Sequence, residues 1–315
     1  MPALTRHPDG VTAIDAFYVR PKLDAAHLIV HRGRAAFVDT GTAHSVPDLL
    51  AALQGEGLEA ADVDYVFLTH VHLDHAGGAG QLIRALPNAR VVLHPRGAPH
   101  MMDPTALIAG TIDVYGAAAY RRLYGEILPI AAERIVVTSD GQRLALAGRE
   151  FEFLHTPGHA MHHQAIRDGN TGCVFSGDTF GISYREFDVD GRPFIFPTTT
   201  PTQFDPDQLR ASIARIVATR PAAVYLTHYS RVTNVPQLAA QMLALVTDFE
   251  RLALANANSA ERQKAIRAAM RDMLLAALRA HGCRQSDLEL EQLLASDLDL
   301  NAAGLVSWLA RRRHA

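Results

Sequence analysis

The sequence has few of the features that would tie it to an oxidising compartment or to nucleic acid. Only two of its 315 residues are cysteines, Cys173 and Cys283, which excludes a disulfide framework. The 33 acidic residues slightly outnumber the 30 basic ones, for a net charge of −3. A charge so close to zero gives no electrostatic reason to bind nucleic acid or an anionic membrane. We therefore expect neither as a partner.

Long apolar runs are missing as well. No apolar stretch approaches the length that spans a bilayer, and residues 1–8 lack the apolar segment of a secretory signal. We therefore expect a cytoplasmic protein. Apolar residues still make up 48% of the chain, enough to bury a large core, and an α/β core of about 200–250 residues is common for a chain of this length.

What the sequence does contain is a dense set of metal-binding side chains. His70, His72, Asp74 and His75 fall within six positions. The apolar run 65–68 precedes them, and Gly77 and Gly78 open a helix after them. A strand that ends at this point would deliver all four side chains into one turn. Imidazole nitrogen and carboxylate oxygen are ligands that suit Zn, Fe or Mn.

This motif resembles that of the metallo-β-lactamase-fold hydrolases, in particular the glyoxalase II and lactonase-like branch. The rest of the family pattern follows in the family's order over roughly residues 10–230. Its elements are an acid before a glycine (Asp39), a histidine in a Pro-Gly-His turn (His159), a lone acid after a strand (Asp178) and a histidine that ends the last core strand (His228).

The resemblance implies a centre of two divalent transition-metal ions, with Zn ahead of Fe or Mn. One ion would be held by His70, His72 and His159, the other by Asp74, His75 and His228, and Asp178 would bridge them. Asp39 would support the motif turn from behind. His163 either supports the centre in the same way or lies on the surface.

The resemblance also implies an α/β fold, a four-layer αββα sandwich. We expect a catalytic domain over 1–232 with a mostly helical insertion at about 97–133, which either covers the core or overhangs the metals. The alternation of apolar and polar residues predicts short strands and hairpins, the first of them over 11–19. Beyond 233 the apolar spacing predicts a C-terminal extension of three or four helices. These helices can pack on the core or form a homodimer, and we expect both, with the first helix after His228 on the core and the later ones shared with a partner.

The predicted function is hydrolysis of a small-molecule ester, thioester or lactone by a metal-bridging hydroxide that Asp74 orients. The aromatic side chains after Asp178 either form an apolar pocket wall or anchor their own loop; they include Phe180, Tyr184 and Phe196. Only Arg231 is basic just after His228, which disfavours a glutathione substrate. Two alternatives are a diiron redox or oxygen-binding protein, whose relatives carry Glu at the position of His72, and a metal-containing sensor.

Overall fold

The computed structural model describes residues 2–199 and 202–312. The chain divides into two compact units. The first comprises Met1–His155, His162–Gly177 and Arg220–Thr233. The second comprises Thr156–Met161, Asp178–Thr219 and Asn234–Ala315.

The first unit contains a seven-stranded sheet in the order β1-β2-β3-β4-β5-β6-β7. β1 to β4 pair antiparallel, and β4 to β7 pair parallel. The strands are β1 (Leu4–His7), β2 (Val11–Asp15), β3 (Ala25–His31), β4 (Arg34–Val38), β5 (Val63–Phe67), β6 (Arg90–Leu93) and β7 (Ile135–Val137).

A six-stranded sheet completes this unit in the order β13-β12-β11-β10-β9-β8. Only β11 and β12 pair parallel. The strands are β8 (Gln142–Leu146), β9 (Arg149–His155), β10 (Gln164–Asp168), β11 (Val174–Gly177), β12 (Val224–Leu226) and β13 (Ser230–Val232).

The two faces of β4 show how the layers are built. Ala36 and Val38 belong to a buried cluster with Phe153 and Phe175 of the second sheet. Ala35 and Phe37 belong to another cluster with residues of the helices. Because side chains alternate across a strand, the apolar residues of β4 contribute to both buried clusters.

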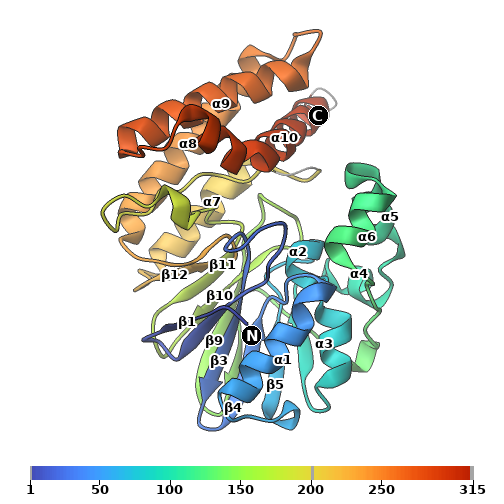
Figure 1. The fold of residues 1–315 in the computed structure, drawn as a ribbon. Helices are drawn as coiled ribbons and strands as arrows, with labels where there is room; N and C mark the ends of the chain where they lie inside the picture. Colours follow the sequence, from blue (N-terminus) through green and yellow to red (C-terminus); the bar gives the residue numbers. More distant parts are fainter. Residues whose placement is uncertain (1, 200–201, 313–315) are drawn as a thin grey trace. The chain divides into compact units, whose positions relative to one another are not determined.

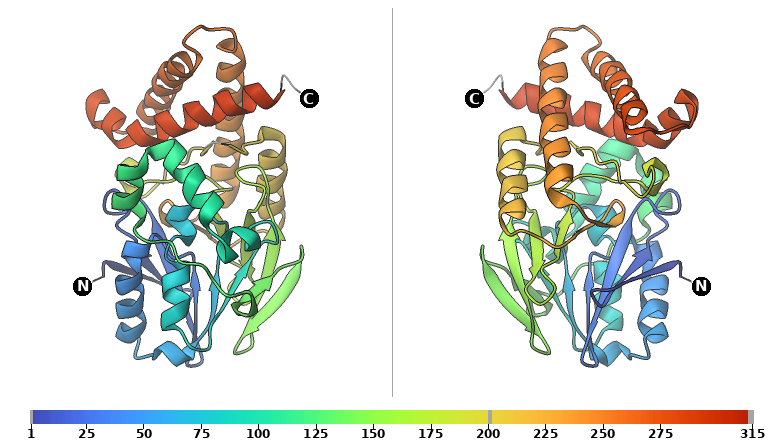
Figure 2. Two further views of the ribbon diagram at one scale, coloured as in Figure 1. Left: turned by 90° about the vertical axis from the view of Figure 1, so that its right-hand side faces the viewer. Right: turned by 90° about the vertical axis from the view of Figure 1, so that its left-hand side faces the viewer.

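Helices cover the outer face of the first sheet through that second cluster. The longer ones are α1 (Val46–Gly55), which buries Leu49 and Leu53, and α3 (Ala79–Ala85), which buries Leu82. The short α2 (Leu73–Ala76) carries part of the histidine motif. Figures 1 and 2 show α4 (Ala98–Met102), α5 (Thr105–Tyr115) and α6 (Ala117–Tyr124) at the same end of the sheet as α2. These three helices fall within residues 97–133, where the sequence predicts a helical insertion.

The second unit is helical. Its helices are α7 (Pro206–Ala218), α8 (Val235–Ala255), α9 (Arg262–His281) and α10 (Asp287–Arg312). Ser286 and Glu289 form a capping box at the start of α10, because the Ser286 N–H donates to the Glu289 carboxylate (2.7 Å) and the Ser286 hydroxyl accepts from the Glu289 N–H (3.3 Å). In the described part of the chain, none of the helices is long and apolar enough to cross a membrane. Two mixed sheets with covering helices and C-terminal helices confirm the predicted fold class.

The first predicted strand was too long. The sequence predicts a strand over 11–19, but β2 ends at Asp15. The Asp15 carboxylate accepts hydrogen bonds from the backbone N–H groups of Phe17 (2.9 Å) and Lys22 (2.8 Å), which closes the loop 16–24. Phe17 and Val19 have positive φ angles of 50° and 61°, which a strand cannot accommodate. The short edge strands β1 and β13 were not predicted at all.

Candidate metal centre

The histidine motif lies in the turn that follows β5. The strand is buried between its neighbours, and the Leu68 N–H still donates to the Val92 carbonyl (2.9 Å). The chain then leaves the sheet at Thr69, and α2 begins after His72, its N-cap. A strand end followed at once by a helix start therefore presents four ligand-type side chains within one turn, as the sequence predicts.

Asp74, His75 and His228 form a compact group in the first unit. One ligand atom of each lies within 4.8 Å of the others. Asp74 Oδ2 is 3.8 Å from His75 Nε2 and 3.9 Å from His228 Nε2. His75 is fully buried, whereas the Asp74 side chain keeps 22% of its exposure. Two imidazole nitrogens that converge on a carboxylate oxygen are a donor set that fits a divalent transition metal.

Asp39 holds the His75 ring from the far side. The His75 Nδ1 donates to Asp39 Oδ2 (3.0 Å), which also accepts from the Thr227 hydroxyl (2.9 Å). The Thr69 N–H donates to Asp39 Oδ1 (2.8 Å), so the same carboxylate fixes the start of the motif turn. A carboxylate that accepts from Nδ1 selects the tautomer whose Nε2 carries no proton and can bind a metal. Asp39 therefore has the contacts that a supporting acid requires.

Asp24 is the equivalent support for His228, and sequence reasoning missed it. Its Oδ1 lies 2.5 Å from His228 Nδ1, which is also 3.2 Å from the Leu23 carbonyl. Asp24 is completely buried, and this burial raises its pKa to about 6 against the opposing effect of His228. The one available sign was a charged residue directly before the apolar strand that begins at Ala25. A buried carboxylate at such a position needs a partner.

His70 and His72 bring two more ring nitrogens together. His70 Nε2 is 2.9 Å from His72 Nδ1, and His70 Nδ1 is 3.2 Å from the Thr69 hydroxyl. The His163 ring is buried and stacks on His70, with ring centroids 5.0 Å apart. The first unit thus supplies five of the seven predicted ligands, and the His163 ring stacks on one of them, His70.

The other predicted residues belong to the second unit. His159 Nε2 lies 3.3 Å from Asp178 Oδ2, and both side chains are buried. Phe180, Tyr184 and Phe196 are buried as well, and the Tyr184 ring contacts Phe187 and Phe196. The Tyr184 hydroxyl donates to the Asp297 carboxylate of α10 (3.1 and 3.2 Å). These contacts attach the aromatic loop to its own unit.

Comparison with known proteins identifies the family. The sequence profile of the Metallo-beta-lactamase superfamily matches residues 23–228, about two thirds of the chain. The chain belongs to this superfamily. Two solved structures share its fold at 19% identity. One is an archaeal superfamily protein of Sulfolobus tokodaii (TM-score 0.65, covering 95% of this chain and 99% of that one). The other is a metallo-beta-lactamase family protein of Thermus thermophilus (TM-score 0.64, covering 99% and 92%).

Curated relatives include hydroxyacylglutathione hydrolases. That of Xanthomonas euvesicatoria is 33% identical over 188 residues, which is 59% of this chain and 54% of the relative. The chain thus spans about half the length of this relative. Arg231, the basic residue after His228, donates from Nε to Asp9 Oδ2 (2.9 Å), which also accepts from the Tyr225 hydroxyl. Arg231 is therefore already occupied with an ion pair inside this member of the superfamily.

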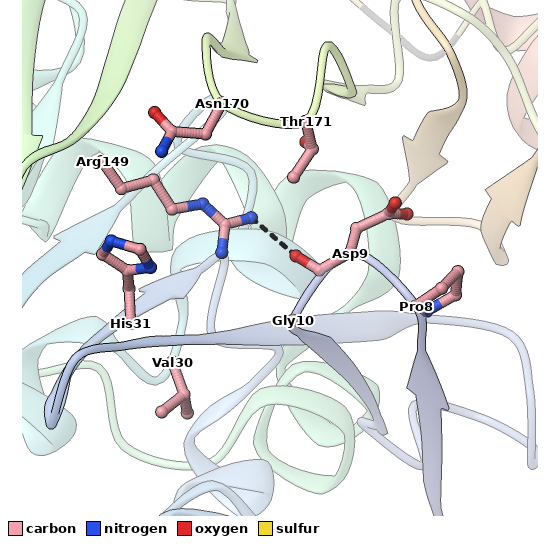
Figure 3. Close-up of a pocket in the computed structure, with 8 residues that line it drawn as sticks. All are labelled: Pro8, Asp9, Gly10, Val30, His31, Arg149, Asn170 and Thr171. Atoms are coloured by element: carbon pink, nitrogen blue, oxygen red, sulfur yellow. Dashed lines mark hydrogen bonds between the residues drawn. The ribbon is translucent and has the colours of Figure 1, made fainter.

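A polar hollow of about 380 Å³ lies at the strand ends that are opposite to the candidate metal ligands. Arg149 is the first residue of β9, and His31 is the last residue of β3. The opposite end of each strand is the one near the candidate metal ligands. Figure 3 shows the Arg149 guanidinium directed at the Asp9 carbonyl, to which it donates (2.9 Å). The same nitrogen lies 2.6 Å from Asp168 Oδ2. Because the buried Asp168 carboxylate already balances the charge of Arg149, we interpret this hollow as a structural feature and not as a binding site.

Proposed function

We propose that the protein is a metal-dependent hydrolase with two divalent transition-metal ions, zinc ahead of iron or manganese. His70, His72 and His159 would hold one ion, Asp74, His75 and His228 the other, and Asp178 would be shared between them. The observation that carries the proposal is the convergence of His75 Nε2 and His228 Nε2 on Asp74, with Asp39 and Asp24 on the opposite ring nitrogens. Superfamily membership supports the remaining ligands.

Two such ions, when bound, supply an activated water and stabilise developing negative charge. The chain's own residues have separate tasks. Asp39 and Asp24 fix the tautomers and the orientation of two ligand rings. Asp74 is the partly exposed member of its group, so its free carboxylate oxygen can accept the proton that the attacking water loses.

The substrate is a small molecule with an ester, thioester or lactone bond. The hydroxyacylglutathione hydrolases among the relatives support this class of bond. The protein would work in the cytoplasm, and two copies would associate through the C-terminal helices. The ion pair between Arg231 and Asp9 favours substrates other than glutathione thioesters.

The test combines metal analysis with a substrate screen. Protein purified without chelator should contain close to two equivalents of Zn, Fe or Mn, and it should hydrolyse at least one member of a panel of esters, lactones and thioesters. Asp178→Ala should lose at least one ion and nearly all turnover, because a shared carboxylate fixes both ions.

Asp207→Ala is the matched control, since the Asp207 side chain keeps 91% of its exposure on the first turn of α7. This variant should retain both ions and full turnover. Folded wild-type protein that takes up no metal would overturn the proposal. If the protein bound both ions but hydrolysed none of these substrates, the metal site would stand and the hydrolase activity would be rejected.

A further inference from the structure

One buried glutamine joins the start of the motif turn to the second sheet. Gln164 is the first residue of β10 and is completely buried. Its backbone N–H donates to the Thr69 carbonyl (2.8 Å), and its side-chain Nε2 donates to the Leu68 carbonyl (2.9 Å). Leu68 and Thr69 are the last two residues before His70. A single residue of β10 therefore holds both carbonyls at the point where the histidine motif leaves β5.

The oxygen of the same carboxamide is fixed as well. The Thr138 hydroxyl, directly after β7, donates to Gln164 Oε1 (2.7 Å), which is closer to it than the Leu93 carbonyl (3.2 Å). This hydroxyl also lies 3.4 Å from His155 Nε2 at the end of β9. A hydroxyl donates one hydrogen and can accept others. The hydrogen bonds therefore run in one direction, from the imidazole through the hydroxyl and the carboxamide to the Leu68 carbonyl.

This direction explains why a glutamine occupies the position. The Leu68 carbonyl can only accept a hydrogen bond, whereas the Thr138 hydroxyl gives its hydrogen to an acceptor. A carboxamide offers one donor and one acceptor on neighbouring atoms. A glutamate at position 164 would place an acceptor against the carbonyl, and a methionine of similar length would form neither bond. Because buried polar groups require partners, packing by itself does not select this residue type.

The surroundings of the turn are tightly filled. A Cβ at Gly177, the last residue of β11, would lie 2.7 Å from the Thr69 hydroxyl oxygen and 2.6 Å from His163 Nε2. The His163 ring stacks on His70, and the Thr69 N–H donates to Asp39 Oδ1 (2.8 Å). The start of the motif turn is thus held by the carboxylate that follows β4 and by residues at the start of β10.

We propose that Gln164 is a positioning residue for the metal centre, which acts by fixing the end of β5 and with it His70 and His72. The inference rests on the proposed function and deepens it. Asp39 holds the His75 ring through its Nδ1, so a shift of the strand end moves His70 and His72 relative to His75. Loss of the carboxamide bonds therefore affects the ion assigned to His70 and His72 more than the ion assigned to His75.

The test uses cobalt(II), whose visible absorption depends on the geometry of its ligands. In cobalt-loaded protein, Gln164→Met should change this spectrum and lower the affinity for one of the two ions by about tenfold, measured by chelator competition. The affinity for the other ion should stay unchanged. Thr138→Val should change the spectrum in the same way but less, because the carboxamide keeps its bond to Leu68. Thr138→Ser, which keeps the hydroxyl, should match the wild type.

Gln81→Met is the matched control. Gln81 Nε2 also donates to a backbone carbonyl, that of Glu126 (3.2 Å), but from within α3. This variant should match the wild type in its cobalt spectrum and in both affinities. An unchanged spectrum and unchanged affinities in folded Gln164→Met would overturn the positioning role, whatever the change in stability. If Gln164→Met does not fold, an unchanged spectrum of Thr138→Val overturns the role instead.

Failure of the proposed function would give different results. Wild-type protein that binds no cobalt would reject the metal centre and the role of Gln164 together. Wild-type protein that binds two ions but hydrolyses no ester, thioester or lactone would reject only the hydrolase activity. The comparison of cobalt spectra would then still decide about Gln164, because it does not depend on turnover.

Discussion

At the scale of single residues, the candidate centre depends on how each ligand ring is held from behind. Asp39 and Asp24 each contact the Nδ1 of one histidine, so both rings direct Nε2 toward Asp74. The two carboxylates come from loops that precede the motif in the sequence. The orientation of His75 and His228 is therefore set by residues that bind no metal themselves.

We predict that Asp24→Asn weakens metal binding without harming the fold. Without the carboxylate, His228 loses the partner that fixes its tautomer, and metal affinity should fall by roughly 10- to 100-fold. Burial raises the pKa of Asp24 to about 6. The ionised Asp24 carboxylate therefore destabilises the metal-free protein at neutral pH. The neutral amide removes that cost, so the metal-free variant should be at least as stable as the wild type.

Chelator competition measures the affinity, and urea unfolding measures the stability. Asp15→Asn is the matched control, because Asp15 is a buried carboxylate in the same region whose hydrogen bonds go to the backbone of Phe17 and Lys22. An Asp24→Asn protein with unchanged metal affinity would show that Asp24 does not position His228.

At the scale of elements, two helical glycines have opposite surroundings. Gly80 lies in α3, where an added Cβ would collide with the carbonyl of Leu128, which follows α6. Gly110 lies in α5, where an added Cβ would meet nothing within 4 Å. The same substitution should therefore act in opposite directions at the two sites.

We predict that Gly110→Ala stabilises the protein by up to about 1 kcal/mol, the difference in helix propensity between the two residues. Gly80→Ala gains the same propensity but must push a backbone carbonyl aside, at a cost of roughly 1–3 kcal/mol. Its net effect should be destabilising. Urea midpoints of the two variants provide the measurement, and stabilisation by Gly80→Ala would mean that α3 does not pack closely on residues 127–130.

At the scale of the whole molecule, the C-terminal helices carry both buried and exposed apolar side chains. Their apolar stripe is buried within the second unit at Ile266, Met270 and Leu274. Leu254 at the end of α8 and Leu288 at the start of α10 remain 43% and 66% exposed. Exposed leucines on helices that extend beyond the superfamily match at residue 228 support the proposed association of two copies.

We predict a dimer of this 34.2 kDa chain, since twofold symmetry is the commonest arrangement of soluble oligomers. Light scattering at micromolar concentration should give twice the chain mass, and the double variant Leu254→Asp and Leu288→Asp should shift it toward the monomer. A wild-type protein of strictly monomeric mass would exclude this association.

Much of the fold was predictable because the relevant patterns are local. Alternating residues determine which segments form strands, and the spacing of apolar positions determines the helices. The motif of His70, His72, Asp74 and His75 is equally local, since one turn contains all four side chains. Local rules also explain the errors. β1 and β13 have only four and three residues, too few for a pattern, and the loop after Asp15 is closed by a single side chain.

The tertiary structure decided the contacts that connect distant segments. Asp24 meets His228 across 204 positions, and Tyr18 meets Tyr124 across 106. No periodicity near Asp24 or Tyr18 reveals such a partner, because the meeting point depends on how β3, β4 and β12 are ordered within their sheets. The sequence by itself determined which residues can bind a metal. Which groups orient those residues follows only from the packed sheets, since burial brings together polar groups that must then satisfy one another.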